Sequence, residues 1–305
     1  MRRFGTSYFW ATLLLPKKIQ HQTVELYKFV RIPDQIVDDI SSDDIPSPIG
    51  RVLGWGSDPS LLTDKSVTLT EFTARRQTAY DNNAVDDELF GEWIRIMYEH
   101  DIDPTYTEAF MAAMQQDLTV TRYETYDQLH EYMYGSAEVV GLMMTDIIGY
   151  DPTYEQATLV WARKLWEAMQ LTNFLRDVCE DCLDLDRIYM PADILAEYKL
   201  THDNIIQFCQ TKSIDHRWIA YMKHMIKLCD QMYDEANDTI QYLTPSCQSA
   251  IIMASDLYRA ILRKLESIKY NQFAYSATTT RRDKLVVIAK RQFVCKYFIS
   301  CFSKE

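Results

Sequence analysis

The chain has 305 residues and a formal net charge of −12, and 47% of its residues are hydrophobic. Proteins that bind nucleic acids usually present a basic surface, so this acidic balance argues against a nucleic-acid partner. The 8 glycines and 9 prolines are few for this length, which favours helices over sheets and turns. The C-x-x-C pair Cys179 and Cys182 is followed by no second cysteine or histidine pair. Free thiols in a reducing compartment are therefore favoured over a zinc or redox site.

Hydrophobic periodicity predicts helices along almost the whole chain. The expected helices, in chain order, cover 20–40, 68–82, 84–100, 104–121, 126–149 and 153–183, then a short helix after a break at 187–191, then about 214–242, 246–270 and 280–300. The segment 41–67 holds three prolines and three glycines, and it predicts one long flexible loop. No change of composition marks a boundary, so residues 1–305 are interpreted as a single all-α domain.

No segment has the length and composition of a membrane span. The apolar run near the N-terminus contains Thr6, Ser7 and Thr12 and lacks a small-residue cleavage site, so we interpret it as mature protein. The stretch VVGLMMTDIIGY is interrupted by Asp146 and is too short to cross a bilayer. We therefore expect a cytoplasmic protein whose membrane contact is peripheral, on the inner face of the cell membrane.

A stripe of oxygen-bearing side chains follows one face of an expected long helix. Asn173, Asp177 and Asp181 are spaced four residues apart, and four residues turn an α-helix by about 400°, so all three share a face. Gln170 lies at the start of the same face. A solvated face would mix these residues with lysine and arginine, whereas this stripe carries acceptors only, with Arg176 one position aside.

A second acidic pair, Asp34 and Asp38, occurs far away in the sequence with the same spacing, and Arg31 and Tyr27 precede it. If the two helices face each other, five oxygen ligands converge. Such ligands suit Mg²⁺, whose shell substrate phosphates complete, and the absence of sulfur and imidazole argues against zinc. The alternative is two solvated acidic faces, which are common on exposed helices. Spacing alone leaves both interpretations open.

Three segments, YKFVRIPDQIVDD, YMYGSAEVVG and MQLTNFLRDVCEDCLDLDRIYMP, resemble the phytoene/squalene synthase family, and the bacterial or archaeal phytoene synthases most of all. The similarity runs nearly from end to end. The first family motif, D-x-x-x-D after an arginine, matches Arg31, Asp34 and Asp38. The second and more specific motif matches Gln170, Leu171, Asn173, Arg176, Asp177, Asp181, Arg187, Tyr189 and Pro191.

The resemblance implies an isoprenoid-synthase helical bundle around a central cavity. It also implies a prenyl transferase that condenses two prenyl diphosphates head to head, with Mg²⁺ or Mn²⁺ as cofactor. The implied metal ligands are Asp34, Asp38, Asn173, Asp177 and Asp181. The implied catalytic residues are the four aspartates together with Arg31 and Arg176. The implied substrate-binding residues are Tyr27, Arg31, Tyr132, Gln170, Asn173, Arg176 and Tyr258.

Some positions depart from the family pattern. Gln35 stands where an acidic residue is frequent, and Pro33 predicts either a bend or a new helix start beside Asp34. Glu138 replaces a small residue, and we expect it to turn outward or to pair with a basic side chain. The small residues nearby, Ser136, Ala137 and Gly141, either leave room for a prenyl tail or permit close helix packing.

The length of the substrate follows from resemblance rather than from spacing. Thr12 and Val24 fall at cavity positions where some C15 enzymes carry bulkier aromatics, which favours the C20 substrate geranylgeranyl diphosphate and the product 15-cis-phytoene, in carotenoid biosynthesis. The alternative is a dehydrosqualene or squalene synthase that acts on farnesyl diphosphate. No dinucleotide fingerprint is present, so NADPH is not expected. An alternative of another class is an inactive relative that serves as an assembly or interaction protein.

Overall fold

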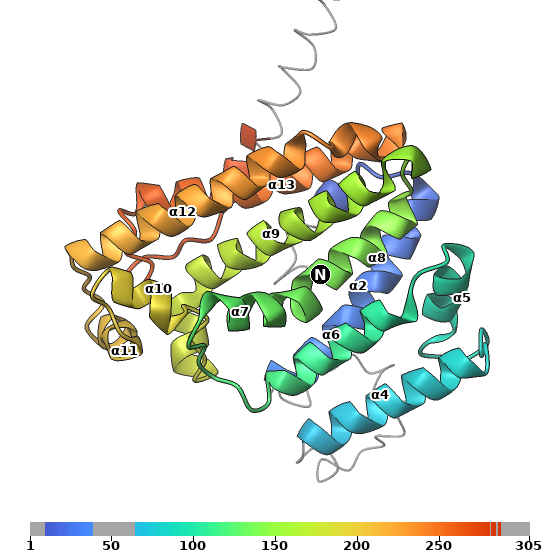
Figure 1. The fold of residues 1–305 in the computed structure, drawn as a ribbon, viewed down its shortest axis with the longest axis horizontal. Coiled ribbons are helices and arrows are strands. Elements are labelled where there is room, and N and C mark those ends of the chain that lie inside the picture. The colour runs from blue at the N-terminus through green and yellow to red at the C-terminus, as the bar shows by residue number, and fades with distance from the viewer. Residues whose placement is uncertain (1–9, 39–64, 281, 285, 288–305) are drawn as a thin grey trace, which may run out of the picture.

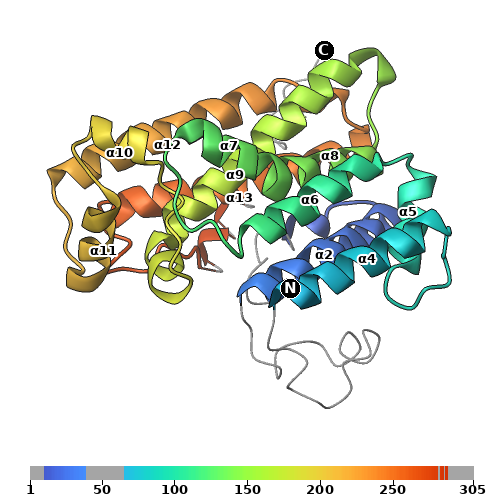
Figure 2. The same cartoon turned by 60° about the horizontal axis from the view of Figure 1, so that its bottom comes forward.

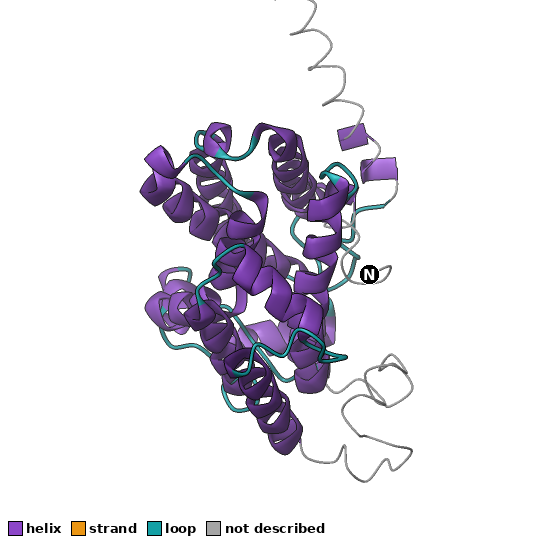
Figure 3. Ribbon diagram, turned by 90° about the vertical axis from the view of Figure 1, so that its right-hand side faces the viewer, coloured by secondary structure: helices purple, strands orange, loops and turns teal. Residues whose placement is uncertain are grey.

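The computed structural model describes residues 10–38, 65–280, 282–284 and 286–287, and this part of the chain is helical without strands (Figures 1 and 3). Only isolated bridges join Arg122 to Ile188 and Tyr150 to Leu243 within it. The expected all-α fold is therefore confirmed. The loop expected at 41–67 lies outside the described residues except for its last three, which begin a helix, and most of the helix expected at 280–300 lies outside them as well.

The helices alternate with short turns. In chain order they are α2 (Lys17–Asp38), α4 (Lys65–Asp81), α5 (Gly91–Glu99), α6 (Pro104–Gln116), α7 (Tyr126–Met133), the π-helix η2 (Tyr134–Glu138), α8 (Val139–Ile148), the 3₁₀ turn η3 (Pro152–Tyr154), α9 (Glu155–Asp184), α10 (Ala192–Glu197), α11 (His202–Thr211), α12 (His216–Asn237), the 3₁₀ turn η4 (Ile240–Tyr242) and α13 (Pro245–Ser267). Among the described residues, none of these helices is both long and apolar enough to cross a membrane.

The 30-residue helix α9 forms the centre of the bundle. It packs against α12 and α13 on one side and against α8 and η2 on the other. Helix α2 crosses α8, and α4 and α5 cover the outer side of α2 (Figures 1 and 2). Since α2 and α9 carry the two acidic stripes, their placement around one interior decides whether those stripes meet.

Local capping explains where several helices begin. The side chain of Asp103 accepts a hydrogen bond from the backbone N–H of Thr105, with Pro104 at the first helical position of α6. Asp215 caps α12 by accepting from two backbone N–H groups in its first turn. At the other end of a helix, Gly149 terminates α8 with a φ of 78°, a conformation that glycine adopts without strain.

The observed boundaries correct the expected ones in three places. Residues 84–90 form turns instead of helix, because the carboxylate of Asp87 accepts from the backbone N–H groups of Leu89 and Phe90, both at 2.8 Å. Helix α6 ends at Gln116, earlier than expected. The helix α11 is an addition to the expected elements, and its capping box at the N-terminus is the sequence signal for it.

Pro33 lies inside α2, which continues unbroken to Asp38. The alternative of a new helix start beside Asp34 is therefore wrong. The Pro33 side chain is buried. Since no break intervenes, Tyr27, Arg31, Asp34 and Asp38 lie on one helix, as the motif requires.

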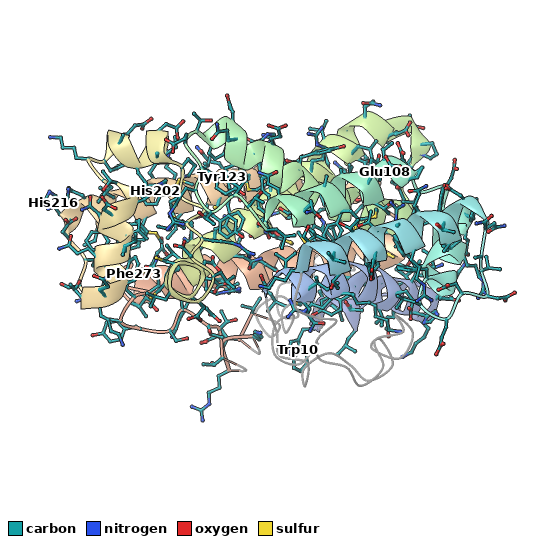
Figure 4. The ribbon with its side chains drawn as sticks, turned by 90° about the horizontal axis from the view of Figure 1, so that it is seen from below. Trp10, Glu108, Tyr123, His202, His216 and Phe273 are labelled. Atoms are coloured by element: carbon teal, nitrogen blue, oxygen red, sulfur yellow. The ribbon has the colours of Figure 1, made fainter. Side chains whose placement is uncertain are left out.

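Aromatic packing closes the end of the bundle far from α4. The ring of Trp218 lies 5.1 Å from that of Phe273 and 6.0 Å from that of Phe208, and Trp218 is fully buried. Figure 4 labels Phe273. Its indole N–H donates to the backbone oxygen of Tyr270 at 3.0 Å, so the polar atom is satisfied. This cluster anchors α12 and the segment after α13 against α11.

Asp146 lies near the end of α8, and its carboxylate forms no ion pair with a basic side chain among the described residues. Burial, followed by the charges of Asp101, Asp103 and Glu155, raises its pKa to about 7. In the unfolded chain the group titrates near its ordinary value of 3.8. Between these two values the folded protein binds more protons than the unfolded one, so stability falls as the pH rises through this window.

Replacing Asp146 with asparagine removes this pH-dependent cost. We expect D146N to raise the free energy of unfolding by roughly 1–2 kcal/mol at pH 8, after allowance for partial solvent screening. At pH 4 the variant and the wild type should have nearly equal stability, because the carboxyl is then neutral in the folded state. Urea denaturation at both pH values measures this. An equal effect at the two pH values would contradict the assignment.

Candidate active site

A cavity of about 240 Å³ opens between α2, α6, α7, η2, α8, α9 and α13. One end is polar and the other is apolar. Its lining comprises Leu26, Tyr27, Val30, Arg31, Asp34, Phe110, Met114, Tyr132, Ser136, Ala137, Val140, Trp166, Gln170 and Tyr258. Six of the residues expected to bind metal or substrate line it directly: Tyr27, Arg31, Asp34, Tyr132, Gln170 and Tyr258.

Helix α2 supplies the first acidic side chains at the polar end. Arg31 donates to the carboxylate of Asp34, three residues later on the same helix face. The Asp34 side chain forms part of the cavity wall and is 41% exposed. Burial and the nearby charge of Asp38 raise its pKa to about 7, although the Arg31 guanidinium opposes the shift.

Helix α9 supplies the second set. The guanidinium of Arg176 donates two hydrogen bonds to the carboxylate of Asp177, one of them from Nε to Oδ1 at 2.6 Å. One turn earlier, the Oδ1 atom of Asn173 is buried and accepts no hydrogen bond. The Tyr258 hydroxyl of α13 lies against this face, since its pKa responds to Arg176, Asn173 and Asp177 after the larger effect of burial.

The two acidic stripes face each other across the polar end. Burial raises the pKa of Asp181 to about 8, and the next largest contributions come from Asp177 on its own helix and Asp38 on α2. Arg187 links the two residues, because its backbone N–H donates to the backbone oxygen of Asp181 at 2.9 Å and its Nη1 atom donates to Oδ1 of Asp38 at 2.9 Å. The structure brings the stripes together, as the hypothesis of a shared site requires.

Asp117 and Arg187 complete this region, and the sequence reasoning left both without a role at the site. Arg187 donates from Nη1 to Oδ1 of Asp38 at 2.9 Å and from Nη2 to the backbone oxygen of Asp117 at 3.1 Å. The carboxylate of Asp117 accepts from the hydroxyls of Tyr132 at 2.7 Å and Tyr189 at 3.3 Å. The hydroxyl of Tyr132 thus points to Asp117, while the residue itself lines the cavity.

Arg187 belongs to the motif R-x-Y-x-P, which is a sequence signal for its importance. Asp117 has no such signal, because only folding places it beside residues from three other segments. A ring system backs this network: Tyr189 stacks on Phe174 at 4.0 Å, and Tyr123 lies 5.6 Å from Tyr132 (Figure 4 labels Tyr123). These contacts hold the hydroxyls in place.

Lys284 is a further residue that the sequence did not indicate. It is 4% exposed, and burial together with the positive charge of Arg176 lowers its pKa. The Lys284 side chain therefore lies in the neighbourhood of Arg176 on the α9 stripe.

The apolar end of the cavity is bounded by Trp166. A second, smaller cavity of about 30 Å³ lies on the other side of this residue and is lined by Thr12, Leu15 and Met169 among others. Trp166 contributes to both linings. Thr12 thus lies at an apolar cavity, as expected, whereas Val24 lines neither of the two.

The small residues of η2 and α8 divide into two roles. Ser136 and Ala137 line the larger cavity, so their size leaves space there. Gly141 instead permits close packing, because a Cβ atom at this position would lie only 2.2 Å from the Trp166 ring. Glu138 is buried and accepts a hydrogen bond from Arg163 at 2.6 Å, which confirms that it pairs with a basic side chain.

The residues at the polar end fit a hard divalent cation. Four aspartates and one amide offer only oxygen atoms, the crowded carboxylates repel one another, and Asn173 Oδ1 lacks a partner. Asp34, Asp38, Asn173, Asp177 and Asp181 would hold such an ion. Their individual assignments as ligands stay a prediction, as do the catalytic and substrate-binding roles expected from the sequence.

Comparison with known proteins identifies the family. A sequence model described as squalene/phytoene synthase matches residues 1–289. The chain belongs to this family. Its members are prenyltransferases that use a divalent metal to bind the diphosphate of a prenyl substrate.

Curated relatives agree with this membership. A chloroplastic phytoene synthase from an Oncidium hybrid cultivar is 28% identical over 93% of this chain. A 15-cis-phytoene synthase from Enterobacter agglomerans is 28% identical over 92% of this chain. The aligned region covers 64% of the orchid protein and 89% of the bacterial one.

Solved structures share the fold. A dehydrosqualene synthase superposes with a TM-score of 0.74 at 21% identity, over 97% of this chain and 94% of that one. A squalene synthase from Alicyclobacillus acidocaldarius gives a TM-score of 0.70 at 17% identity, over 89% of this chain and 90% of that one. The predicted isoprenoid-synthase fold is therefore confirmed.

The facing carboxylates predict opposite effects of one substitution with and without metal. We expect D181N to raise the thermal midpoint of the metal-free protein, because it replaces a carboxyl group whose ionised form is disfavoured by burial and by the charges of Asp177 and Asp38. The same variant should lose most of the stabilisation that Mg²⁺ gives the wild type, since a ligand charge is gone.

Thermal unfolding in chelator and in millimolar Mg²⁺ measures both effects. D184N is a matched control, because Asp184 is on the same helix one turn beyond the expected ligands. Equal Mg²⁺ responses in wild type and D181N would contradict the placement of the ion.

Proposed function

We propose that this protein condenses two molecules of geranylgeranyl diphosphate head to head, forms 15-cis-phytoene through a cyclopropyl (prephytoene) diphosphate, and releases pyrophosphate. The observation that carries the proposal is the pair of acidic stripes facing each other at the mouth of an apolar cavity. Family membership and the phytoene synthases among the relatives support it.

The divalent ion, when bound, would neutralise the diphosphate and favour its departure. Arg31, Arg176 and Lys284 add positive charge on the same side, so they bind the phosphate oxygens and stabilise the leaving group as its C–O bond breaks. In the free protein Arg31 and Arg176 pair with Asp34 and Asp177. These pairs keep the guanidinium groups in position before substrate arrives.

The cavity separates charge from hydrocarbon. The double bond of the second substrate attacks the allylic carbon of the first, a proton leaves, and the cyclopropyl diphosphate forms. Loss of the second pyrophosphate, rearrangement and loss of another proton give the C40 product, so no reductant is consumed. The apolar lining excludes water, which would otherwise capture the carbocations. Tyr27 and Tyr258 line the cavity, and their aromatic rings would stabilise positive charge there.

Turnover of prenyl diphosphates is tested directly by incubating the purified protein with Mg²⁺ and either geranylgeranyl or farnesyl diphosphate, without NADPH. We expect a C40 hydrocarbon from the C20 substrate in chromatographic analysis. D177A should reduce product formation by at least about 1000-fold, because it removes a metal ligand and the partner of Arg176, while circular dichroism stays unchanged.

E180A is the control, since Glu180 lies on the same helix and belongs to neither motif position. If D177A keeps most of its turnover, the metal assignment is wrong. If the wild type converts neither substrate, the alternative of an inactive assembly or interaction protein is favoured instead.

A second candidate substrate is farnesyl diphosphate, as in dehydrosqualene or squalene synthases. Trp166 favours it, because this residue ends the larger cavity and shortens the space for a chain. We expect W166L to raise the ratio of C20 to C15 turnover by about fivefold or more, since it joins the two cavities.

The variant G141A is expected to have the opposite effect on this ratio. Its Cβ would push the Trp166 ring toward the cavity, so the C20 to C15 ratio should fall. Competition assays with equal concentrations of both substrates measure the ratio. A change in the same direction for both variants would show that Trp166 does not set the length.

Contact with a membrane and the absence of a nucleic-acid partner stay predictions, as does a cytoplasmic location at the inner face of the membrane. Leu13 and Leu14 support the contact: they are 49% and 46% exposed, and they adjoin Thr12 and Leu15 at the smaller cavity. An apolar product would leave readily at such a place. Co-sedimentation with liposomes tests this contact, and a protein that stays wholly in the supernatant would argue against it.

A further inference from the structure

A second cluster of ionisable side chains lies behind the cavity wall and takes no part in the chemistry described above. His130 of α7, Glu138 of η2 and Glu167 of α9 each direct one ligand atom toward a common point, and these atoms all lie within 4.8 Å of one another. Both glutamates are buried, whereas the His130 side chain is 42% exposed. The cluster is therefore open to solvent only through the histidine.

The decisive observation is at Glu138. Its side chain is 1% exposed, and its Oε1 atom accepts no hydrogen bond. The atom points into the cluster, 3.3 Å from Nε2 of His130. A buried carboxylate oxygen without a partner is costly, so some positive species is expected beside it.

The two facing atoms need a cation between them or beside them. A neutral imidazole with its proton on Nδ1 would turn the lone pair of Nε2 toward the lone pairs of the carboxylate, and the contact would be repulsive. A proton on Nε2 would relieve this, but the 3.3 Å contact does not form a hydrogen bond. A metal ion that accepts both lone pairs satisfies the two atoms at once.

We propose that His130, Glu138 and Glu167 form a second, structural metal site that binds Zn²⁺. The Nε2 atom of His130 is 3.3 Å from Oε1 of Glu138 and 3.7 Å from Oε1 of Glu167. Ligands at about 2.0–2.1 Å around a tetrahedral zinc ion are separated by roughly 3.4 Å, so these distances need only small adjustments. A water molecule at the exposed side would supply the fourth ligand.

Neighbouring side chains hold the carboxylates in the required orientation. Arg163 donates from Nε to Oε2 of Glu138 at 2.6 Å, which leaves Oε1 for the ion. The hydroxyl of Tyr126 donates to Oε1 of Glu167 at 2.8 Å, and the second lone pair of that oxygen stays free. Such outer partners are typical of metal sites, where they fix the ligands and tune their charge.

The π-helix explains why Glu138 reaches this point. In a regular α-helix, residues eight apart such as His130 and Glu138 point roughly 80° away from each other. The wider turn of Tyr134–Glu138 rotates the chain less per residue, and Glu138 returns to the His130 face. On the opposite side of the same turn, Ser136 and Ala137 line the substrate cavity.

The chemistry of this cluster differs from that of the acidic stripes. The stripes offer oxygen atoms only, which suits Mg²⁺, whereas an imidazole with two carboxylates suits a transition ion. An ion here would tie α7 and η2 to α9 through side chains that are one or two residues from the cavity lining. We therefore assign it a structural role, independent of turnover.

The test uses the full-length protein, stripped with chelator and then titrated with Zn²⁺ in millimolar Mg²⁺ by isothermal calorimetry. We expect one zinc ion bound by the wild type, and H130A and E138Q should bind it at least about tenfold more weakly. Zn²⁺ should also raise the thermal midpoint of the wild type by roughly 5 °C at 100 times its dissociation constant, and that of H130A hardly at all.

Two controls make the result specific. His21 also lies beside two glutamates, but its Nδ1 atom faces Glu25 and its Nε2 atom faces Glu92, so one ion cannot bind all three side chains. We therefore expect H21A to bind zinc as the wild type does. D177N should lose turnover and keep the zinc site. H130A, checked for folding by circular dichroism, should keep its Mg²⁺-dependent turnover within about twofold.

Equal zinc binding by wild type and H130A would overturn the proposal, whether through binding elsewhere or through no binding at all. Loss of zinc binding in H21A as well as in H130A would overturn it too, because the ion would then be held by surface histidines in general.

Discussion

The polar end of the cavity depends on repulsion between carboxylates that face each other from α2 and α9. Left alone, Asp38 and Asp181 would favour separation of the two helices or protonation of one carboxyl. The protein offsets this with basic side chains: Arg31, Arg176 and Arg187 each pair with one aspartate of the set. The result is a site that is close to balanced without ligand and that gains most when cations and a diphosphate arrive together.

The apolar packing around the cavity explains how the bundle tolerates this concentration of charge. Helix α9 is buried on several sides by α8, α12 and α13, so the free energy of burying its hydrophobic residues offsets the cost of its acidic stripe. The polar side chains are confined to one end of the cavity. Trp166 and the residues of α8 make the other end apolar. The single helix α9 thus carries the expected metal ligands at one end and Trp166, which lines both cavities, nearer the other.

The cluster of His130, Glu138 and Glu167 depends on a local change of helix geometry, the π-helix that contains Glu138. The π-helix at Tyr134–Glu138 presents small residues to the cavity on one side and a buried carboxylate on the other. Glu138 contacts Arg163 and His130, and His130 in turn contacts Glu167, so these four side chains form one connected set. The buried carboxylate is tolerated because Arg163 supplies opposite charge at hydrogen-bonding distance.

The sequence by itself determined the all-α fold and the composition of each stripe, because both follow from local periodicity along single helices. Asn173, Asp177 and Asp181 share a face by spacing alone, and the motifs around them identified the family. Tertiary structure decided that the stripes meet, that Asp117 joins Arg187 and two tyrosines, and that Trp166 divides the apolar space. Tertiary structure also decided that Glu138 faces His130, through a π-helix that the hydrophobic pattern of the sequence does not predict. These features arise from contacts between segments distant in sequence, and the packing of whole helices is what brings such segments together.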